Sequence, residues 1–335
     1  MAFSSTESSI LYVAEGKAPE TKNPFEKYRF NPDLGEGLDG KRRPTVFFYR
    51  WNELSSNTTM NQGSLSRLKT PEGIRFGQVI FSPNSDGILY ATGYEFTKDG
   101  RILGIKGCYN RPTGIWQLKL ESELSEAPTN NVSDINAKAE KLTPSHLSCR
   151  SPRTVTHNGR SSLVWLSAPS GGAHIATHEL YSLDITSDAQ LARGGLDSKP
   201  HVTVVNTPDE DGFPGLYPTY NIPKDFLLES SEGLKILLQS FWGSRTALLE
   251  ISLTGGPNNV KNLTPKSGDD LYSWTMLATD SSSRFICSRS SPSVPYEIVL
   301  GQLEPSGEIL WRVIDKPALP EFSQFFYEFL PDWTC

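Results

Sequence analysis

The side chains that could carry out nucleophilic catalysis do not form a recognisable motif. The five histidines are His146, His157, His174, His178 and His201. None of them stands in the order and context of a Ser–His–Asp triad. The Gly-x-Ser-x-Gly motif of α/β-hydrolases is missing, and the nearest phrases, Gly63-Ser64-Leu65 and Gly243-Ser244-Arg245, lack its flanking glycines. We therefore predict no catalytic residue here, and ordinary loop or surface positions for the histidines.

Ligands for a metal or a cofactor are equally scarce. His174 and His178 are four residues apart, a spacing that places two metal ligands on one face of a helix, but no third ligand accompanies them. The glycine pairs at 171–172, 194–195 and 255–256 do not precede a Gly-Lys-Ser/Thr sequence, so we expect tight turns there and no phosphate loop. The sequence predicts no metal and no cofactor.

Composition narrows the function classes further. The chain has 335 residues, with 32 Lys and Arg against 38 Asp and Glu and a net charge of -6, so its surface repels phosphate backbones and we expect no nucleic-acid partner. No run of 18 apolar residues exists, so we expect no membrane span. The four cysteines, Cys108, Cys149, Cys287 and Cys335, are far apart, which favours free thiols in a cytoplasmic protein.

Repetition is the most informative feature of the sequence, because it defines the elements that must position any functional side chain. Four segments share a polar turn followed by an apolar strand, and a second strand with alternating apolar residues follows each of them. Their first strands are residues 88–93, 162–167, 234–239 and 284–288. Two units end in the same phrase, Leu-Thr-Pro, at 142–144 and 263–265. This pattern is typical of four-stranded propeller blades.

Counting the units predicts an all-β chain, a β-propeller of about five four-stranded antiparallel blades. Their expected bounds are 8–55, 60–125, 139–207, 214–264 and 268–315. The tryptophans in or beside the strands are expected to fill the core between blades. Two polar segments, Glu121–Glu140 and Ala189–Pro200, are predicted to be surface loops. The propeller region is predicted to span residues 1–318, and residues 319–335 form a C-terminal tail.

Six short segments in this order are informative as a set: Ile10–Glu15, Gly104–Arg111, Cys149–Arg153, Ser244–Ile251, Ser273–Ala278 and Ser290–Pro295. Together they resemble the N-terminal propeller of acylaminoacyl-peptidases, also called acylamino-acid-releasing enzymes, of the prolyl oligopeptidase group. The resemblance implies a propeller that covers the active site of a C-terminal α/β-hydrolase domain. That domain removes an N-acylated amino acid from a blocked peptide. The implied role of the propeller is to restrict entry and to contact other domains and subunits.

The sequence departs from this family in its extent. The α/β-hydrolase domain is absent, so no catalytic Ser, Asp or His is carried over, and we expect the chain to be catalytically silent alone. The implied partners are a hydrolase domain, in cis in a longer gene product or in trans, and N-acylated peptides. Five blades would leave an incomplete ring with uncovered apolar faces at Leu11–Ala14 and near Leu310–Ile314, which favours docking of a partner or homo-oligomers.

The candidate functional residues are two pairs at strand-to-turn junctions. Asn110 with Arg111, and Ser244 with Arg245, are candidates for lining a channel or contacting the hydrolase domain, because a guanidinium group there can bind carboxylates. Hydrogen bonding within a blade is the alternative. A different class of function, a non-enzymatic propeller scaffold that presents its loops to another protein, stays open as well.

Overall fold

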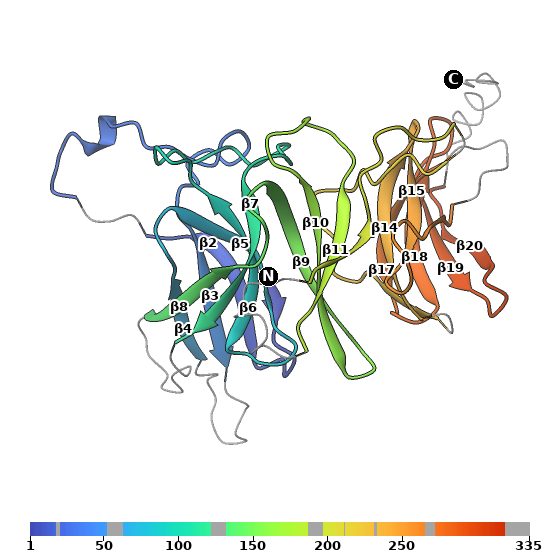
Figure 1. Ribbon diagram of the computed structural model, residues 1–335, viewed down its shortest axis with the longest axis horizontal. Helices are drawn as coiled ribbons and strands as arrows, with labels where there is room; N and C mark the ends of the chain where they lie inside the picture. The colour runs from blue at the N-terminus through green and yellow to red at the C-terminus, as the bar shows by residue number, and fades with distance from the viewer. Residues whose placement is uncertain are drawn as a thin grey trace. The chain divides into compact units, whose positions relative to one another are not determined.

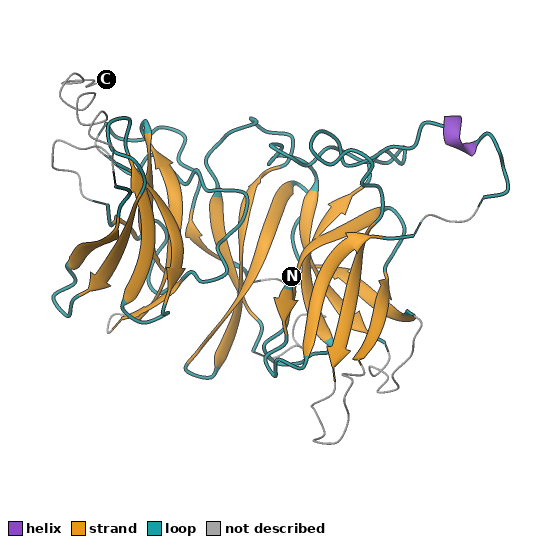
Figure 2. Ribbon diagram, turned by 180° about the vertical axis from the view of Figure 1, so that it is seen from behind, coloured by secondary structure: helices purple, strands orange, loops and turns teal. Residues whose placement is uncertain are grey.

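The computed structural model describes residues 1–17, 21–51, 63–121, 132–186, 197–210, 212–230, 233–264 and 272–318. These residues form strands, loops and one short 3₁₀ helix, η1 (Glu26–Tyr28), as Figure 2 shows. Across the described residues, no helix has the length and apolar character needed to span a membrane. The chain divides into two compact units, Met1–Ala176 with Leu180–Lys199, and Thr177–Glu179 with Pro200–Cys335.

The first unit begins with two antiparallel meanders of four strands each. The first blade contains β1 (Ala2–Phe3), β2 (Ser9–Glu15), β3 (Pro44–Trp51) and β4 (Gly63–Lys69). The second blade contains β5 (Ile74–Phe81), β6 (Ile88–Glu95), β7 (Thr113–Leu120) and β8 (Ser133–Lys141). The last strands of the two blades, β4 and β8, pair in parallel, so the eight strands form one continuous sheet.

The parallel pair is reinforced by side chains on both strands. Arg67 of β4 binds the Asp134 carboxylate of β8 through two nitrogens, at 2.7 and 3.0 Å, and Lys69 lies 3.0 Å from the same carboxylate. The hydroxyl groups of Ser66 and Ser133 are 2.7 Å apart. These contacts are mostly exposed and each contributes little alone, but together they fix the register of an otherwise open edge.

Strand β8 corrects one sequence-based prediction. Glu121–Glu140 was expected to be a surface loop because it is polar, yet Ser133–Glu140 belongs to this strand, and residues 122–131 lie outside the described residues. Ile135 is buried, whereas Asp134 and Asn136 on either side of it are exposed. A strand covered on only one face needs only alternate apolar residues, so its composition is that of a loop.

The remaining blades follow in chain order (Figure 1). The third contains β9 (Leu147–His157), β10 (Arg160–Pro169), β11 (Glu179–Asp184) and β12 (Lys199–Val202). The fourth contains β13 (Leu227–Ser230), β14 (Gly233–Trp242), β15 (Arg245–Ser252) and β16 (Val260–Asn262). The fifth contains β17 (Ser273–Thr279), β18 (Arg284–Ser290), β19 (Glu297–Leu303) and β20 (Ile309–Asp315).

The core lies between neighbouring blades. In the first unit, Phe48 of β3 packs edge-on against Phe81 of β5, with ring centroids 5.9 Å apart, within a cluster shared by the first two blades. In the second unit, Trp274 of β17 is 2% exposed and its ring centroid lies 4.5 Å from that of Trp311. This cluster also contains Leu237 of the fourth blade. Blades therefore cover one another's apolar faces, which explains why the strands of β14 and β15 are apolar at consecutive positions.

The prediction of an all-β, propeller-like chain with four-stranded antiparallel sheets is confirmed, although the first eight strands form one sheet through the parallel pair of β4 and β8, and several predicted boundaries were wrong. The strand at 63–69 belongs to the first blade, although the sequence placed it in the second. The strand at 133–141 closes the second blade, although the third was expected to begin at residue 139. The phrase Leu142-Thr143-Pro144 follows the fourth strand of its blade, as Leu263-Thr264 does, so the interpretation of a closing phrase was correct.

The predicted uncovered faces have different outcomes. Leu11 is fully buried against the second blade, so the prediction of an uncovered face at Leu11–Ala14 is wrong there, although Val13 and Ala14 are exposed. On β20, Leu310, Val313 and Ile314 are exposed, as expected near the end of the last blade. The tail at 319–335 lies outside the described residues.

Candidate functional site

The connections between the second and third strands of the first three blades gather at one end of the first unit. We call the described residues 16–17 with 21–43, 96–112 and 170–176 the three segments of the loop cluster. Backbone hydrogen bonds join its parts: the Ile105 N–H donates to the Leu34 carbonyl at 3.3 Å, and the Gly171 N–H donates to the Asn110 carbonyl at 2.7 Å. Figure 1 shows these connections along the upper edge of the first unit.

The first segment of the loop cluster is held by two carboxylates. The Asp33 carboxylate accepts hydrogen bonds from the Gly40 and Gly35 N–H groups at 2.9 and 3.0 Å, and these bonds lower its pKa. The Glu15 carboxylate, at the end of β2, accepts the backbone N–H groups of Arg42 and Arg43 at 3.0 to 3.2 Å. Backbone groups that have no strand partner are thereby satisfied, and the segment keeps one conformation.

A close approach between two segments occurs at Gly37. Its φ of 73° is a left-handed backbone that favours glycine, and an added Cβ atom would lie 2.5 Å from the Lys106 ammonium nitrogen, the flexible end of a side chain that can move aside. The first segment therefore lies directly against the second.

The predicted pair Asn110 and Arg111 lies in the second segment, immediately before β7. The Asn110 amide donates to the Gly172 carbonyl at 2.5 Å, so it links the loops of two blades. The Arg111 guanidinium lies 3.7 Å from the Cys108 sulfur, which is also 3.7 Å from His174 Nε2. The hydrogen bonding of Asn110 thus runs between blades, and the alternative of bonding within one blade does not describe it.

Arg150 in β9 was not among the predicted site residues. It is 1% exposed, and its guanidinium lies over the Tyr109 ring at 4.4 Å from the centroid. The Tyr109 carbonyl also accepts a hydrogen bond from the Ser148 hydroxyl at 2.7 Å. A buried cation stacked on an aromatic ring holds this loop against the third blade. The sequence offered no signal for it, because an arginine within a strand is expected to face solvent.

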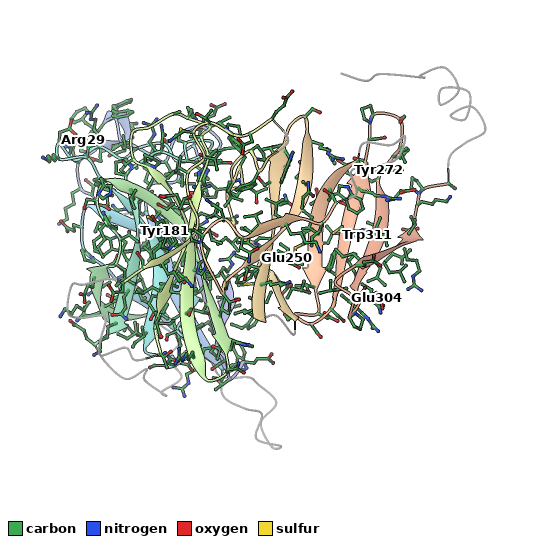
Figure 3. The ribbon with its side chains drawn as sticks, turned by 45° about the vertical axis from the view of Figure 1, so that its right-hand side comes forward. Arg29, Tyr181, Glu250, Tyr272, Glu304 and Trp311 are labelled. Atoms are coloured by element: carbon green, nitrogen blue, oxygen red, sulfur yellow. The ribbon has the colours of Figure 1, made fainter. Side chains whose placement is uncertain are left out.

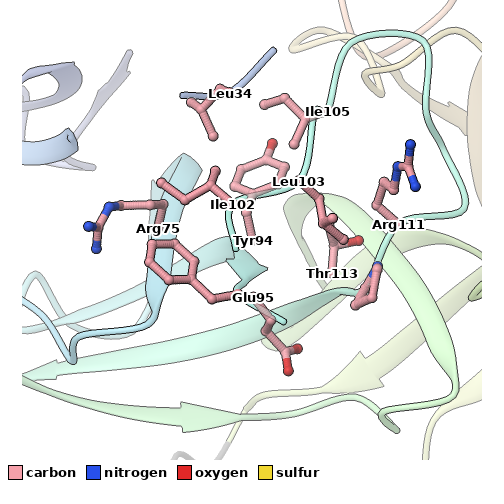
Figure 4. Close-up of a pocket in the computed structure, with 11 residues that line it drawn as sticks. Leu34, Arg75, Tyr94, Glu95, Ile102, Leu103, Ile105, Arg111 and Thr113 are labelled. Carbon is pink, nitrogen blue, oxygen red and sulfur yellow. The ribbon is translucent and has the colours of Figure 1, made fainter. Parts of the chain in front are cut away.

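The cavity within the loop cluster is too small for a peptide. Figure 4 shows Leu34, Leu103 and Ile105 close to Tyr94 and Arg111 around it. It holds about 10 Å³ of space, which corresponds to a single water molecule. Binding by the loop cluster must therefore use its outer surface.

The second predicted pair occupies the corresponding connection of the fourth blade. Ser244 is in the tight turn between β14 and β15, and Arg245 is the first residue of β15, where it pairs with Trp242. Ser244 is exposed and Arg245 is half-buried. The two candidate pairs thus lie in equivalent connections of two blades, but they belong to different units.

A larger hollow lies between the fourth and fifth blades, within the second unit. Its volume is about 1040 Å³, and residues of β14, β15, β16, β19 and the β19–β20 turn line it. In its wall, the Lys235 ammonium lies 2.9 Å from the Glu250 carboxylate, and both side chains are nearly buried. Figure 3 labels Glu250, together with Glu304 of the β19–β20 turn. The charges of Lys235 and Glu250 neutralise each other, so the hollow presents no unpaired charge from this pair to a ligand.

The described histidines and cysteines take part in no cluster that could hold a metal ion. Among the residues that the structure describes, no three His, Cys, Asp or Glu side chains are placed to hold a metal ion. His178 and His201 are buried, so the expectation of loop or surface positions was wrong for them. Cys108, Cys149 and Cys287 are free thiols, as predicted. Burial raises the pKa of the Cys149 thiol, and that of Cys287 to about 12.

Comparison with known families covers nearly the whole chain. The family model described as "Acylamino-acid-releasing enzyme, N-terminal domain" matches residues 1–319. The chain belongs to this family. The resemblance seen in the sequence phrases is thereby confirmed, and the five blades are those of an acylamino-acid-releasing enzyme N-terminal domain.

Curated relatives extend well beyond the match. The Acylamino-acid-releasing enzyme of Arabidopsis thaliana is 34% identical over 294 residues, which is 85% of this chain and 35% of the relative. Acylamino-acid-releasing enzyme 1 of Oryza sativa is 30% identical over 349 residues, 95% of this chain and 42% of the relative. The chain thus spans about two fifths of the length of these relatives.

The solved structures resemble the chain in fold only. A prolyl endopeptidase structure aligns with 96% of this chain and 36% of its own, with a TM-score of 0.50 and 10% identity. At this identity the likeness supports the acylamino-acid-releasing enzyme domain as a member of the same fold class and says nothing about individual residues.

Proposed function

We propose that this chain is the substrate-admitting domain of an acylamino-acid-releasing enzyme. It acts with an α/β-hydrolase domain, in the same chain of a longer product or as a separate chain, and has no hydrolytic activity alone. The observation that carries the proposal is the family match across residues 1–319. The absence of a Gly-x-Ser-x-Gly motif from the sequence supports the assignment of chemistry to the other domain.

The loop cluster supports a role in admission. Its conformation is fixed by specific contacts. Hydrogen bonds hold it at Asp33, Glu15 and Asn110, and stacking on Tyr109 holds it at Arg150. Inter-domain dynamics has a role in catalysis and specificity in prolyl endopeptidases. A propeller with ordered loops would limit access to the hydrolase domain, so that short or unfolded peptides enter and folded chains are excluded by size.

The test has two arms. The purified chain is incubated with a fluorogenic acetyl-alanyl substrate, and we expect no turnover above background. In the second arm, this chain replaces the matching region of the Arabidopsis relative, and the chimera is assayed with acetylated peptides of increasing length. We expect turnover of short peptides and none of acetylated folded proteins.

Two outcomes would overturn the proposal. Turnover by the purified chain that persists after a second purification step would contradict its silence. A folded chimera that cleaves folded and short substrates equally well would contradict the role in admission. An inactive but folded chimera would favour the alternative, a propeller scaffold for another protein.

A further inference from the structure

The charge of the loop cluster is opposite to that of the rest of the chain. Its three segments contain eleven Lys and Arg against five Asp and Glu, whereas the remaining residues contain 21 against 33. A net charge of -6 for the whole chain therefore conceals a basic end on an acidic body. Such asymmetry creates a local field that attracts anions even though the molecule as a whole repels them.

Several of these cations are available to a ligand. Lys22, Lys41, Lys98 and Lys106 are exposed, and none of them is in an ion pair with a described residue. Arg101 differs, since it lies 2.8 Å from the Asp99 carboxylate. The available charges thus come from both the first and the second segment.

Exposed aromatic side chains accompany the cations. Phe25, Tyr28 and Phe30 are 71%, 75% and 86% exposed, and they surround the short helix η1. The Lys27 ammonium lies over the Tyr28 ring at 4.9 Å from its centroid. Apolar rings beside cations suit a ligand that combines an apolar part with a negative charge.

We propose that the loop cluster binds N-acylated peptides through their net negative charge and selects them over peptides with a free amino terminus. This inference rests on the proposed function and names the feature of the substrate that the domain recognises. Acylation converts the terminal ammonium into a neutral amide and leaves the C-terminal carboxylate, so a blocked peptide with neutral side chains carries one negative charge. The same peptide with a free terminus carries none in sum.

Charge recognition of this kind separates the two peptides without any contact to the acyl group. The free ammonium is repelled by the same cations that attract the carboxylate, so the attraction largely cancels in the unblocked peptide. The cations are exposed, so the attraction is screened by salt; the Debye length falls from about 30 Å at 0.01 M to about 3 Å at 1 M. Binding must therefore weaken steeply as salt is added.

The experiment measures binding of three matched peptides to the purified chain by NMR titration. The peptides are Ac-Ala-Ala-Phe-Ala, the same sequence with a free amino terminus, and the acetylated sequence with a C-terminal amide. At 10 mM NaCl we expect the acetylated acid to bind at least about fivefold more tightly than the free-terminus peptide and the amidated peptide, because only it carries a net negative charge that the local field attracts. At 1 M NaCl the three affinities should converge.

Reversing the charge of lysines in the loop cluster tests whether these residues cause the preference for the acetylated acid. In K98E/K106E, two exposed lysines of the second segment become acidic, and the preference for the acetylated acid should disappear. K119E/K138E is the matched control, because it makes the same change in charge on exposed residues of β7 and β8 in the same blade, outside the loop cluster. It should keep most of the preference. Thermal melting verifies that both variants are folded.

Equal affinity for the three peptides at low salt would overturn the inference, and so would binding that salt does not weaken. Loss of preference in K119E/K138E equal to that in K98E/K106E would show a general effect of net charge and also overturn it. None of these measurements involves turnover. Their failure leaves the proposed division of labour with a hydrolase domain standing, and turnover by the chain alone would leave the binding result standing.

Discussion

The second-to-third strand connections differ greatly between the two units. In the first unit, 28 residues join β2 to β3, and 17 residues join β6 to β7. In the second unit, Gly243 and Ser244 alone join β14 to β15, and six residues join β18 to β19. The strands on either side are similar in length and pairing, so the blades themselves do not require the long connections.

The contrast separates a scaffold, formed by the strands of the blades, from an added part, formed by the long connections of the first unit. A two-residue turn with a left-handed glycine, such as Gly243 with its φ of 62°, suffices to join two antiparallel strands. The long connections of the first unit add an entropic cost on folding that the blade fold does not demand. They are nevertheless ordered by specific bonds from Asp33, Glu15 and Asn110, which is typical of a functional surface on a rigid scaffold.

The largest effect on the scaffold is expected in the core of the second unit. Replacing Trp274 with Ala removes a ring that packs on Trp311 within the cluster shared by the fourth and fifth blades. The cost should be about 3–5 kcal/mol of unfolding free energy, because the short turns offer no slack to fill the cavity. Chemical denaturation followed by tryptophan fluorescence and circular dichroism measures it.

Leu277 provides the control for this prediction, since it lies in the same strand and is half exposed. Leu277→Ala should change the unfolding free energy by about 0.5 kcal/mol or less. If Trp274→Ala were equally mild, the blade-to-blade core would not be what stabilises the second unit. The peptide preference of the loop cluster should survive Leu277→Ala unchanged.

The sequence predicted most strands of the blades well and the contacts within the loop cluster poorly, for a physical reason. Apolar strands such as Ile88–Glu95 and Gly233–Trp242 are covered on both faces, so their composition alone identified them. Strand β8 was missed because only one of its faces is covered. The choice of Asn110 followed from its position at a junction, but its partner Gly172 is 62 residues away in the chain, and no local pattern indicates such a pairing.

Arg150 and Lys106 illustrate the same limit. Arg150 in strand β9 stacks on Tyr109 in a connection of the preceding blade, and Lys106 lies across Gly37 between connections of two blades. Which connections meet depends on how the blades are stacked, whereas sequence phrases describe each blade separately. The charge of the loop cluster was likewise invisible in the net charge of -6, because it appears only when the three segments are grouped.

An intermediate effect is expected at the seams between blades, where a glutamine performs the same task in both units. The Gln239 side chain of β14 accepts the backbone N–H of Met276 in the next blade at 3.1 Å. The Gln78 side chain of β5 accepts the N–H of Ser151 at 2.9 Å. Both acceptors meet an irregular position of the next blade's first strand, beside Leu277 and at Ser151, which has a φ of 59°.

Replacing Gln239 with Ala should lower the unfolding free energy by about 1–3 kcal/mol, because the buried N–H of Met276 loses its acceptor. Replacing Gln78 with Ala should cost less, because the Thr92 hydroxyl, 3.1 Å from the Ser151 N–H, remains as an acceptor. Gln302→Ala is the control, since Gln302 lies at the half-exposed surface of β19 and makes no such bond among the described residues. Thermal melting of the three variants compares them directly. If Gln239→Ala and Gln302→Ala had the same melting temperature, the hydrogen bond between Gln239 and Met276 would contribute nothing to stability. The two units could then not be compared through this kind of bond.

The smallest effect is expected within the loop cluster itself, at Asp33. The bonds from Gly40 and Gly35 lower the pKa of this carboxyl below its ordinary value of about 4. A group whose pKa is lowered by folding contributes stability above that ordinary value and loses it as the pH falls through the folded pKa. Asp33→Ala should therefore speed hydrogen exchange of the Gly35 and Gly40 amides at pH 7 and leave global melting almost unchanged.

Asp39→Ala is the matched control, because Asp39 is exposed in the same segment and accepts no hydrogen bond from a described residue. As the pH falls through the lowered pKa of Asp33, the exchange of Gly35 and Gly40 in the unmodified chain, corrected for intrinsic rates, should approach that of Asp33→Ala, since the protonated carboxyl is a weaker acceptor. Equal exchange in the two variants at pH 7 would mean that the segment is ordered by its contact with Lys106 and Ile105 alone. Packing between connections would then order the loop cluster, just as packing between blades stabilises the strands.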